Sequence, residues 1–232
     1  MRDKAVSRIF DEASRDGRKF LFEHEAKALC GLYAMPVTMI NLAKTEDDAV
    51  KAAEKIGFPI VLKIVSPQVL HKSDAGGVLV NIKDKQGTRE GFKRIMKNVM
   101  AYAPKAEIIG VIVQEMAPNG TEVIVGSTRD STFGPTIMFG LGGIFVEILK
   151  DVSFRLVPIT RTDAEEMVRE IKAYRILEGV RGKPPVDQET IIDVLMKTSK
   201  MLEECPEIRE LDINPIIVYE KGAKIVDARV IL

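Results

Sequence analysis

The sequence has no tryptophan, only two cysteines and only two histidines among its 232 residues. Cys30 and Cys205 lie far apart, with no CxxC pair and no Cys/His cluster around either of them. Zinc sites and disulfide frameworks both need such groupings, so neither is predicted. We expect both cysteines to be buried, reduced thiols.

A charge excess and a long apolar run are also missing. The 34 basic and 34 acidic residues cancel, which argues against a nucleic-acid-binding surface. No apolar run approaches the roughly 18 residues that a membrane-spanning helix needs, and the charged opening MRDKAVSRIFDEASRDGRK does not resemble a signal peptide. The sequence therefore predicts a cytoplasmic protein that binds a small molecule or another protein.

Several phosphate-binding and catalytic motifs do not occur. GxxxxGK[ST] is absent, and GLGG at 140–143 does not extend to GxGxxG because Phe145 occupies the position of the last glycine. GxSxG, HExxH and the protein-kinase HRD and DFG sequences are absent as well. These absences exclude a P-loop and argue against a Rossmann nucleotide-binding fold.

The first half of the chain is predicted to form one compact α+β unit. Thr45 followed by Asp48 resembles a capping box, and it opens a helix that Gly57 ends. Periodicity and turn residues predict the other elements. In chain order they are helices at 3–16 and 24–33, a strand at 37–40, a helix at 45–57, a strand at 58–65, a loop at 66–77, a strand at 78–82 and a helix at 88–102.

The second half begins with four apolar stretches that suggest a mostly antiparallel sheet. They are IIGVIVQEM, TEVIVGS, GPTIMFG and SFRLVPI. Two helices follow, one opened by a capping box from Thr162 to Glu165 and one at 188–204, and a hairpin around Lys221-Gly222 closes the chain. APNG at 117–120 is the predicted boundary between two lobes.

Lys63 is the single charged residue inside the apolar segment FPIVLKIV. An unpaired ammonium is costly to bury, so this lysine either points to solvent from an edge strand or binds an anion. The double glycine Gly76-Gly77 favours the second interpretation, because residues without side chains let backbone N–H groups approach a phosphate. Together these residues predict a phosphate site.

LDINP at 211–215 places Asp212 and Asn214 on the same face of a strand, because side chains two residues apart point the same way. Asp227, in the segment IVDARV, is expected close by. Magnesium takes one or two carboxylates together with phosphate oxygens and water, so these residues predict a Mg²⁺ site. The alternative is that they only initiate turns around Pro215, although no turn residue is needed at Asp227 in the middle of a strand.

His71 lies in the glycine-ended loop HKSDAGGV, where loop residues often carry function. A histidine can act as a covalent nucleophile, and a loop of this length can move its tip. A solvated loop histidine without a chemical role is the alternative. The other histidine, His24, lies in a predicted helix and is given no chemical role.

Two further segments flank the predicted lobe boundary, where ligand clefts often form. They are VQEM at 113–116 and EVIVG, which begins with Glu122. An adenine could bind here, although charged residues at strand ends are common on any surface.

Taken together, the segments IGFPIVLKIVSPQVLHKSDAGGV, VQEM, EVIVGSTRDSTFGPTIMFGLGGIFVE, ILEGVRG, ELDINPIIV and VDARVIL span nearly the whole chain. In this order they resemble the β subunit of ADP-forming acetyl-CoA synthetase (acetate:CoA ligase, ADP-forming). The resemblance implies an α+β, two-lobed ATP-grasp fold that holds a nucleotide between its lobes. The implied division is an N-terminal helix at 1–20, a first lobe at 21–112 with a phosphohistidine loop at 66–77, and a second lobe at 113–232 with the nucleotide and Mg²⁺ site.

The resemblance also implies a role for each candidate residue. Lys63, Gly76 and Gly77 would contact the nucleotide phosphates, and Gln114, Glu115, Met116 and Glu122 would hold adenine and ribose. Asn214 and Asp227 match magnesium ligands of the related succinyl-CoA synthetase β chain. Asp212 has the position of a glutamate there that steadies a phosphohistidine. His71 would be a mobile phosphohistidine that receives a phosphoryl group from one on the α subunit and delivers it to ADP.

By the same resemblance, the chain would work with an α subunit that carries the CoA-binding domain and the first phosphohistidine, in an α2β2 heterotetramer. The implied reaction converts acyl-CoA, ADP and phosphate reversibly to acid, CoA and ATP, with Mg²⁺ as cofactor. Two alternatives stay open. One is a carboxylate–amine ligase of the same fold, which needs no histidine; the other is a nucleotide sensor without enzymatic activity.

Overall fold

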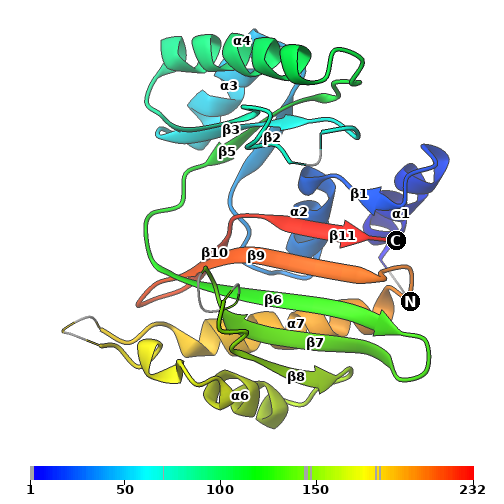
Figure 1. The fold of residues 1–232 in the computed structure, drawn as a ribbon, viewed down its shortest axis with the longest axis vertical. Coiled ribbons are helices and arrows are strands. Elements are labelled where there is room, and N and C mark those ends of the chain that lie inside the picture. The colour runs from blue at the N-terminus through cyan, green and yellow to red at the C-terminus, as the bar shows by residue number, and fades with distance from the viewer. Residues whose placement is uncertain (1–2, 70, 144–145, 147, 181, 183) are drawn as a thin grey trace. The chain divides into compact units, whose positions relative to one another are not determined.

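The computed structural model describes residues 3–69, 71–143, 146, 148–180, 182 and 184–232. Contacts divide the chain into two compact units (Figure 1). The smaller unit is Thr38–Pro118, and the larger unit combines Met1–Val37 with Asn119–Leu232. The break after Pro118 lies within the APNG segment.

The lobe ranges implied by the resemblance differ from these units at two places. Residues 21–37 were expected in the first lobe, but they pack with the larger unit. Residues 113–118 were expected in the second lobe, but they belong to the smaller unit.

In the described residues, the smaller unit is a four-stranded antiparallel sheet in the order β2-β5-β3-β4. Its strands are β2 (Ile40–Ala43), β3 (Ile60–Val65), β4 (Val78–Ile82) and β5 (Gly110–Glu115). The helices α3 (Glu46–Ile56) and α4 (Lys85–Tyr102) lie together on one face of the sheet (Figure 1). Apolar side chains from the helices and strands form one buried cluster between them.

Strand β5 corrects one prediction. Its segment IIGVIVQEM was expected to begin the sheet of the second half, but β5 pairs with β2 and β3 in the smaller unit. The segment Gly110–Gln114 is buried throughout, as suits a strand with a partner on each side. An apolar run shows that a strand is buried, but it does not specify which sheet the strand joins.

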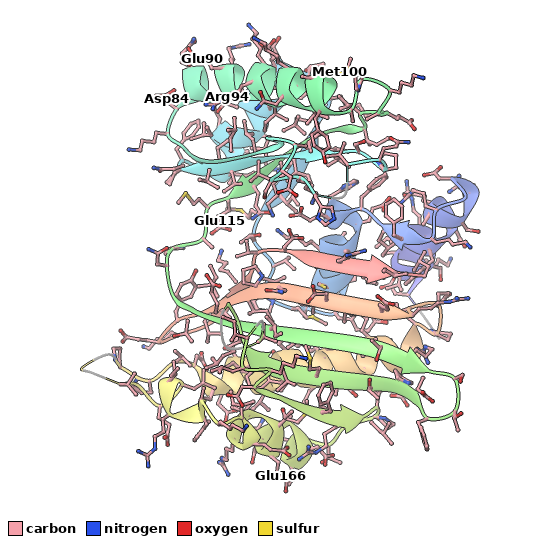
Figure 2. The ribbon with its side chains drawn as sticks, viewed as in Figure 1. Asp84, Glu90, Arg94, Met100, Glu115 and Glu166 are labelled. Carbon is pink, nitrogen blue, oxygen red and sulfur yellow. The ribbon has the colours of Figure 1, made fainter. Side chains whose placement is uncertain are left out.

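Two starts in the smaller unit also differ from expectation. Helix α4 begins three residues earlier than predicted because the Asp84 carboxylate accepts a hydrogen bond from Gly87 N at 2.7 Å; Figure 2 labels Asp84 beside the helix start. The strand predicted at 37–40 overlaps β2 (Ile40–Ala43) only at Ile40, and Val37 instead forms an isolated bridge with Ile225. Helix α3 begins as predicted, with Thr45 Oγ1 accepting from Asp48 N.

In the described residues, the larger unit is built around a seven-stranded antiparallel sheet in the order β1-β11-β9-β6-β7-β8, with β10 also paired to β9. The strands are β1 (Phe20–Leu21), β6 (Thr121–Asp130), β7 (Gly134–Leu141), β8 (Val152–Leu156), β9 (Glu210–Val218), β10 (Ala223–Ile225) and β11 (Ala228–Ile231). The helices are α1 (Lys4–Arg15), α2 (Glu23–Leu32), α6 (Arg161–Glu170) and α7 (Gln188–Glu204), with a short 3₁₀ helix η1 (Tyr174–Ile176). The mostly antiparallel sheet, helix α7 and the terminal hairpin are confirmed.

Helix α6 begins with a different capping box from the one predicted. Thr160 is the N-cap: its amide donates to the Asp163 carboxylate at 2.7 Å, and Asp163 N donates back to Thr160 Oγ1 at 3.2 Å. The predicted pair Thr162 and Glu165 lies two residues further along. Both pairs have the required spacing, so the sequence alone did not separate them.

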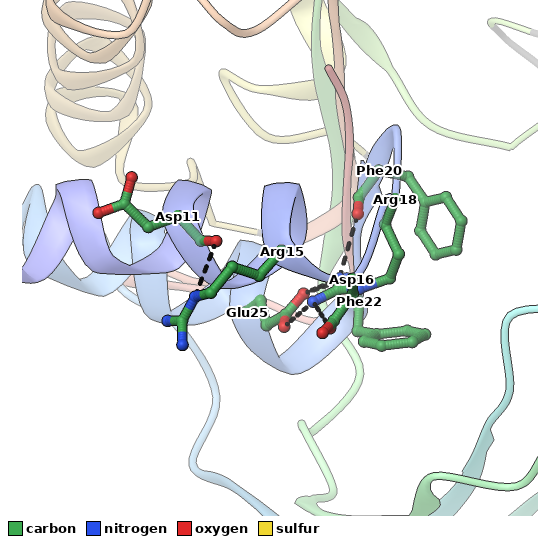
Figure 3. Close-up of polar contacts among 7 residues, drawn as sticks. All are labelled: Asp11, Arg15, Asp16, Arg18, Phe20, Phe22 and Glu25. Carbon is green, nitrogen blue, oxygen red and sulfur yellow. Dashed lines mark hydrogen bonds and ion pairs between the residues drawn. The ribbon is translucent and has the colours of Figure 1, made fainter.

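Within the N-terminal part of the larger unit, Arg18 joins the end of helix α1 to the start of helix α2 (Figure 3). Its guanidinium forms a two-bond ion pair with Glu25, at 2.7 and 2.8 Å, and both side chains are mostly buried. The same group lies 4.4 Å from the centre of the Phe22 ring, and Glu25 also accepts from Phe22 N. These contacts fix the start of helix α2, which packs against β11.

Both cysteines are free and buried, as predicted. Burial raises the pKa of the Cys30 thiol to about 12, against the opposing effect of nearby Lys27. None of the helices in the described part of the chain is long and apolar enough to span a bilayer.

Candidate functional site

Asp212, Asn214 and Asp227 meet on the larger unit. In β9, Leu211 and Ile213 are buried whereas Asp212 and Asn214 point to the exposed face, which confirms that the two polar residues share a face. Asn214 N donates to the carbonyl of Asp227 at 3.2 Å, so the third residue lies directly opposite on the neighbouring chain segment. The structure therefore brings the three predicted residues together, and the charge of Asp227 acts on the Asp212 carboxyl.

Two expectations about these residues were wrong in detail. Strand β9 continues through Pro215 to Val218, so Asp212 and Asn214 do not initiate a turn. Asp227 was expected in the middle of a strand, but it lies at the break between β10 and β11. Asp227 is therefore not part of the regular hydrogen-bonding pattern of either strand.

The electrostatics of Asp212 reflect this grouping. Its side chain reaches solvent, but it lines a hollow of about 270 Å³ on the sheet face. Desolvation in the hollow and the negative charge of Asp227 raise the pKa of the Asp212 carboxyl, and Arg229 opposes that rise. Arg229 is the cross-strand partner of Asp212 and lines the same hollow.

This donor set fits magnesium. In the described ranges, no group of three or more His, Cys, Asp or Glu side chains could hold a metal ion by itself. The face instead offers two nearby carboxylates and an amide oxygen, which leaves most of a metal's coordination positions to other oxygens. Magnesium accepts this because it retains water and binds nucleotide phosphates, whereas a zinc site needs a nearly complete set of protein ligands.

Lys63 is a buried residue of β3, with 7 % of its surface exposed. Strand β3 lies between β5 and β4, and Lys63 pairs with Ile112 and Val78 on the two sides. The alternative of a solvent-facing lysine on an edge strand is therefore wrong. The prediction that it contacts a phosphate stays a prediction.

The double glycine has a packing explanation in this structure. A Cβ on Gly77 would lie 2.5 Å from Ile64 Cγ2, and Gly76 has a φ of +60°, where glycine is favoured. The amides of Gly76 and Gly77 donate to the carbonyls of Ser73 and Lys72. In this loop conformation the two N–H groups therefore bond within the loop, and contact with a phosphate would require the loop to rearrange.

His71 is exposed at the tip of its loop. The tip is bounded by the buried residues Val69 and Ala75, with exposed fractions of 2 % and 4 %. Asn98 of helix α4 donates to the carbonyl of Gly76 at 3.0 Å and holds the far end of the loop. Leu70 lies outside the described residues. The imidazole is therefore accessible between two buried residues of the loop, and its movement stays a prediction.

The residues predicted to hold adenine and ribose fall on both units. Gln114 is buried in β5, whereas Glu115 and Met116 follow it at the strand end, where Figure 2 labels Glu115. The Glu115 carboxylate accepts from Met39 N at 3.1 Å, and Met116 N donates to the Pro59 carbonyl at 3.3 Å.

Glu122 belongs to the larger unit, where it is exposed in β6 and pairs with Ile217. Its carbonyl accepts from Gly142 N at 2.8 Å, and a Cβ at Gly142 would lie 2.9 Å from the Glu122 Cβ. Gly142 of GLGG is thus needed because the chain after β7 passes close to Glu122 of β6. Residues 144–145, 147 and 181, which the resembling segments include, lie outside the described residues.

Arg229 was missed by the sequence analysis. The sequence shows only that Arg229 lies two residues after Asp227, whereas its proximity to Asp212 comes from the pairing of β11 with β9. Lys27, which the structure buries completely, could not be found from the sequence either, because its contact is with a residue 199 positions away.

A family model described as an ATP-grasp domain matches residues 12–232, so the chain is an ATP-grasp protein. The chain is 55 % identical over 224 residues to the β subunit of acetate–CoA ligase [ADP-forming] I from Pyrococcus furiosus, covering 97 % of this chain and 96 % of that one. It belongs to the family of ADP-forming acetate–CoA ligase β subunits. The resemblance of its motifs to this family is thereby confirmed.

Solved structures agree with this assignment. The dinucleotide-forming acetyl-coenzyme A synthetase 1 of Ca. Korarchaeum cryptofilum, in complex with coenzyme A, Ca-AMPCP and HgCl⁺, superposes with a TM-score of 0.95 at 52 % identity, covering 98 % of this chain and 99 % of that one. Another structure of the same enzyme contains coenzyme A and Mg-AMPPCP, with its phosphohistidine segment pointing towards the nucleotide binding site; it matches with a TM-score of 0.88 at 48 % identity, covering 98 % and 99 %.

Proposed function

We propose that this chain is the nucleotide-binding β subunit of an ADP-forming acyl-CoA synthetase and that His71 carries the phosphoryl group to ADP. The overall reaction converts acetyl-CoA or another acyl-CoA, ADP and phosphate to the acid, CoA and ATP. The observation that carries the proposal is the exposed imidazole of His71 on an anchored loop, in a chain whose full length matches a β subunit of this ligase family.

In the proposed transfer step, phosphohistidine 71 meets the β-phosphate of ADP. The N–P bond breaks, an oxygen of the β-phosphate forms the new P–O bond, and the imidazole keeps the electron pair of the broken bond. Such transfers require mainly alignment and neutralisation of charge. A relative's phosphohistidine segment that points towards its nucleotide binding site supports this route.

The other candidate residues receive their roles from this step. Lys63 neutralises phosphate charge, and a loop rearrangement would let Gly76 and Gly77 contribute backbone N–H groups. Gln114, Glu115, Met116 and Glu122 hold the adenosine part. Asp212 accepts the imidazole N–H of the phosphohistidine, because an ionised carboxylate both orients the ring and stabilises it.

Asn214 and Asp227 would hold Mg²⁺, with Asp212 close by. When bound, the ion neutralises negative charge on the nucleotide phosphates. The mixed set of carboxylate and amide oxygens supports this assignment, as does the Mg-AMPPCP in the related structure.

The partner in this proposal is an α subunit that binds CoA and carries the first phosphohistidine, with α2β2 as the expected assembly. The name of the Pyrococcus relative, a subunit beta, supports the need for a partner. The assembly is expected in the cytoplasm.

The test measures ATP formation from acetyl-CoA, ADP and phosphate by the chain reconstituted with its α subunit. We expect His71→Ala to reduce the rate by roughly 1,000-fold or more, because a covalent carrier has no substitute. The chain has one other histidine, so His24→Gln is a matched control and should retain the rate. Binding of ADP without ATP formation by the wild-type complex would favour the nucleotide-sensor alternative instead.

A further inference from the structure

Lys27 is a fully buried cation that the proposed reaction does not use. It lies in helix α2 with 0 % of its surface exposed, and its ammonium donates a hydrogen bond to the carbonyl of Val226 at 3.3 Å. Glu23, which is also buried, lies one helical turn earlier. Buried ionised groups are costly, so a lysine at this position calls for an explanation beyond packing.

The acceptor of this bond lies next to a candidate metal ligand. Val226 precedes Asp227 in the break between β10 and β11, where the regular ladder of the sheet is interrupted. A backbone carbonyl in such a break needs a donor from elsewhere. Lys27 supplies that donor from a different part of the chain.

The segment around Asp227 is held from several sides. Ile225 N donates to the Pro36 carbonyl at 2.7 Å, Val226 N donates to the Pro215 carbonyl at 3.0 Å, and Asn214 N donates to the Asp227 carbonyl at 3.2 Å. These are backbone bonds, and the Lys27 ammonium adds a side-chain donor to them. The N-terminal residues therefore reach the metal-bearing segment through both Pro36 and Lys27.

We propose that Lys27 is a positioning residue for the magnesium site, which fixes the Val226 carbonyl and thereby the placement of Asp227. The inference rests on the proposed function, because it takes Asp227 as a Mg²⁺ ligand. Groups that orient the direct ligands of a metal commonly change its affinity by about 10- to 100-fold.

The test compares ADP binding with and without metal by isothermal titration of the full chain. The dissociation constant of ADP is measured once in EDTA and once with saturating Mg²⁺. The ratio of the constant in EDTA to the constant in Mg²⁺ reports how much the metal strengthens binding. We expect Lys27→Met to lower this ratio by about 10-fold and to leave the constant in EDTA unchanged. A ratio equal to that of the wild type would overturn the inference, whether or not the variant binds ADP more weakly in both conditions.

Lys197→Met is the matched control. The Lys197 ammonium also donates to a backbone carbonyl of the larger unit, that of Ala34 at 2.8 Å. Because Ala34 does not adjoin Asp227 in the chain, loss of this ammonium should leave the ratio unchanged. If Lys27→Met does not fold, the double variant Glu23→Gln/Lys27→Met removes both buried charges and should show the same decrease. Asp227→Asn separates the two proposals: an unchanged ratio in that variant would remove the metal assignment itself, whatever Lys27 does.

Discussion

At the residue scale, the period of two along a strand predicted the shared face of Asp212 and Asn214, because that period depends only on local geometry. The glycines illustrate the opposite case. Gly76 and Gly77 were assigned to a phosphate, but the structure shows packing against Ile64 and a positive φ at Gly76. Glycine serves both purposes, and a sequence does not show which neighbour comes close.

Asp212 gives a prediction about pH. Its raised pKa means that the native state holds the proton more tightly than the unfolded chain does, so this carboxyl lowers stability as pH rises from about 4, the usual Asp value, through the native pKa. Asp212→Asn cannot ionise. We expect its free energy of unfolding, relative to that of the wild type, to increase over this pH window and then to level off.

The measurement is urea unfolding of both proteins at a series of pH values without metal. A stability difference that is independent of pH would contradict the assigned electrostatics of Asp212.

In the reconstituted complex, Asp212→Asn should also transfer the phosphoryl group more slowly, because the imidazole N–H loses an ionised acceptor.

At the element scale, helix and strand types were largely predictable, whereas starts and partners were not. Helix α6 shows why starts are missed: Thr160 and Thr162 are both followed by an acidic residue at the required spacing. Strand β5 shows why partners are missed, since pairing joins segments that are distant in sequence.

The loop that carries His71 gives a prediction at this scale. Asn98→Ala removes the side-chain donor to the Gly76 carbonyl, and a hydrogen bond is worth about 1 kcal/mol. We expect the amides of Gly76 and Gly77 to exchange with deuterium roughly 5-fold faster. Lys97→Ala, an exposed neighbour on the same helix, is the control and should leave the exchange rates unchanged.

At the scale of the whole molecule, the main surprise is that residues 1–37 join the C-terminal part of the chain. Leu21 pairs with Val230, and Val37 bridges to Ile225. These contacts join the two ends of the sequence, so a division of the chain into consecutive ranges could not include them. They also place Lys27 beside the segment that carries Asp227.

Two core substitutions should act on different units. Leu29 of helix α2 and Leu62 of strand β3 are both fully buried, the first in the core of the larger unit and the second in that of the smaller one. We expect Leu29→Ala and Leu62→Ala each to destabilise their own unit by about 3 kcal/mol. Hydrogen exchange in urea, mapped to peptides, measures the stability of each unit separately. If Leu29→Ala destabilised only the smaller unit, the assignment of residues 1–37 would be contradicted.

The central claim is that His71 carries a phosphoryl group, and direct labelling tests it most sharply. The purified chain is incubated with γ-labelled ATP and Mg²⁺, and the label is mapped to a peptide. We expect an acid-labile, base-stable label on the peptide that contains His71; the label should be retained in His24→Gln and absent in His71→Ala. Equal labelling of His71→Ala and the wild type would contradict the claim.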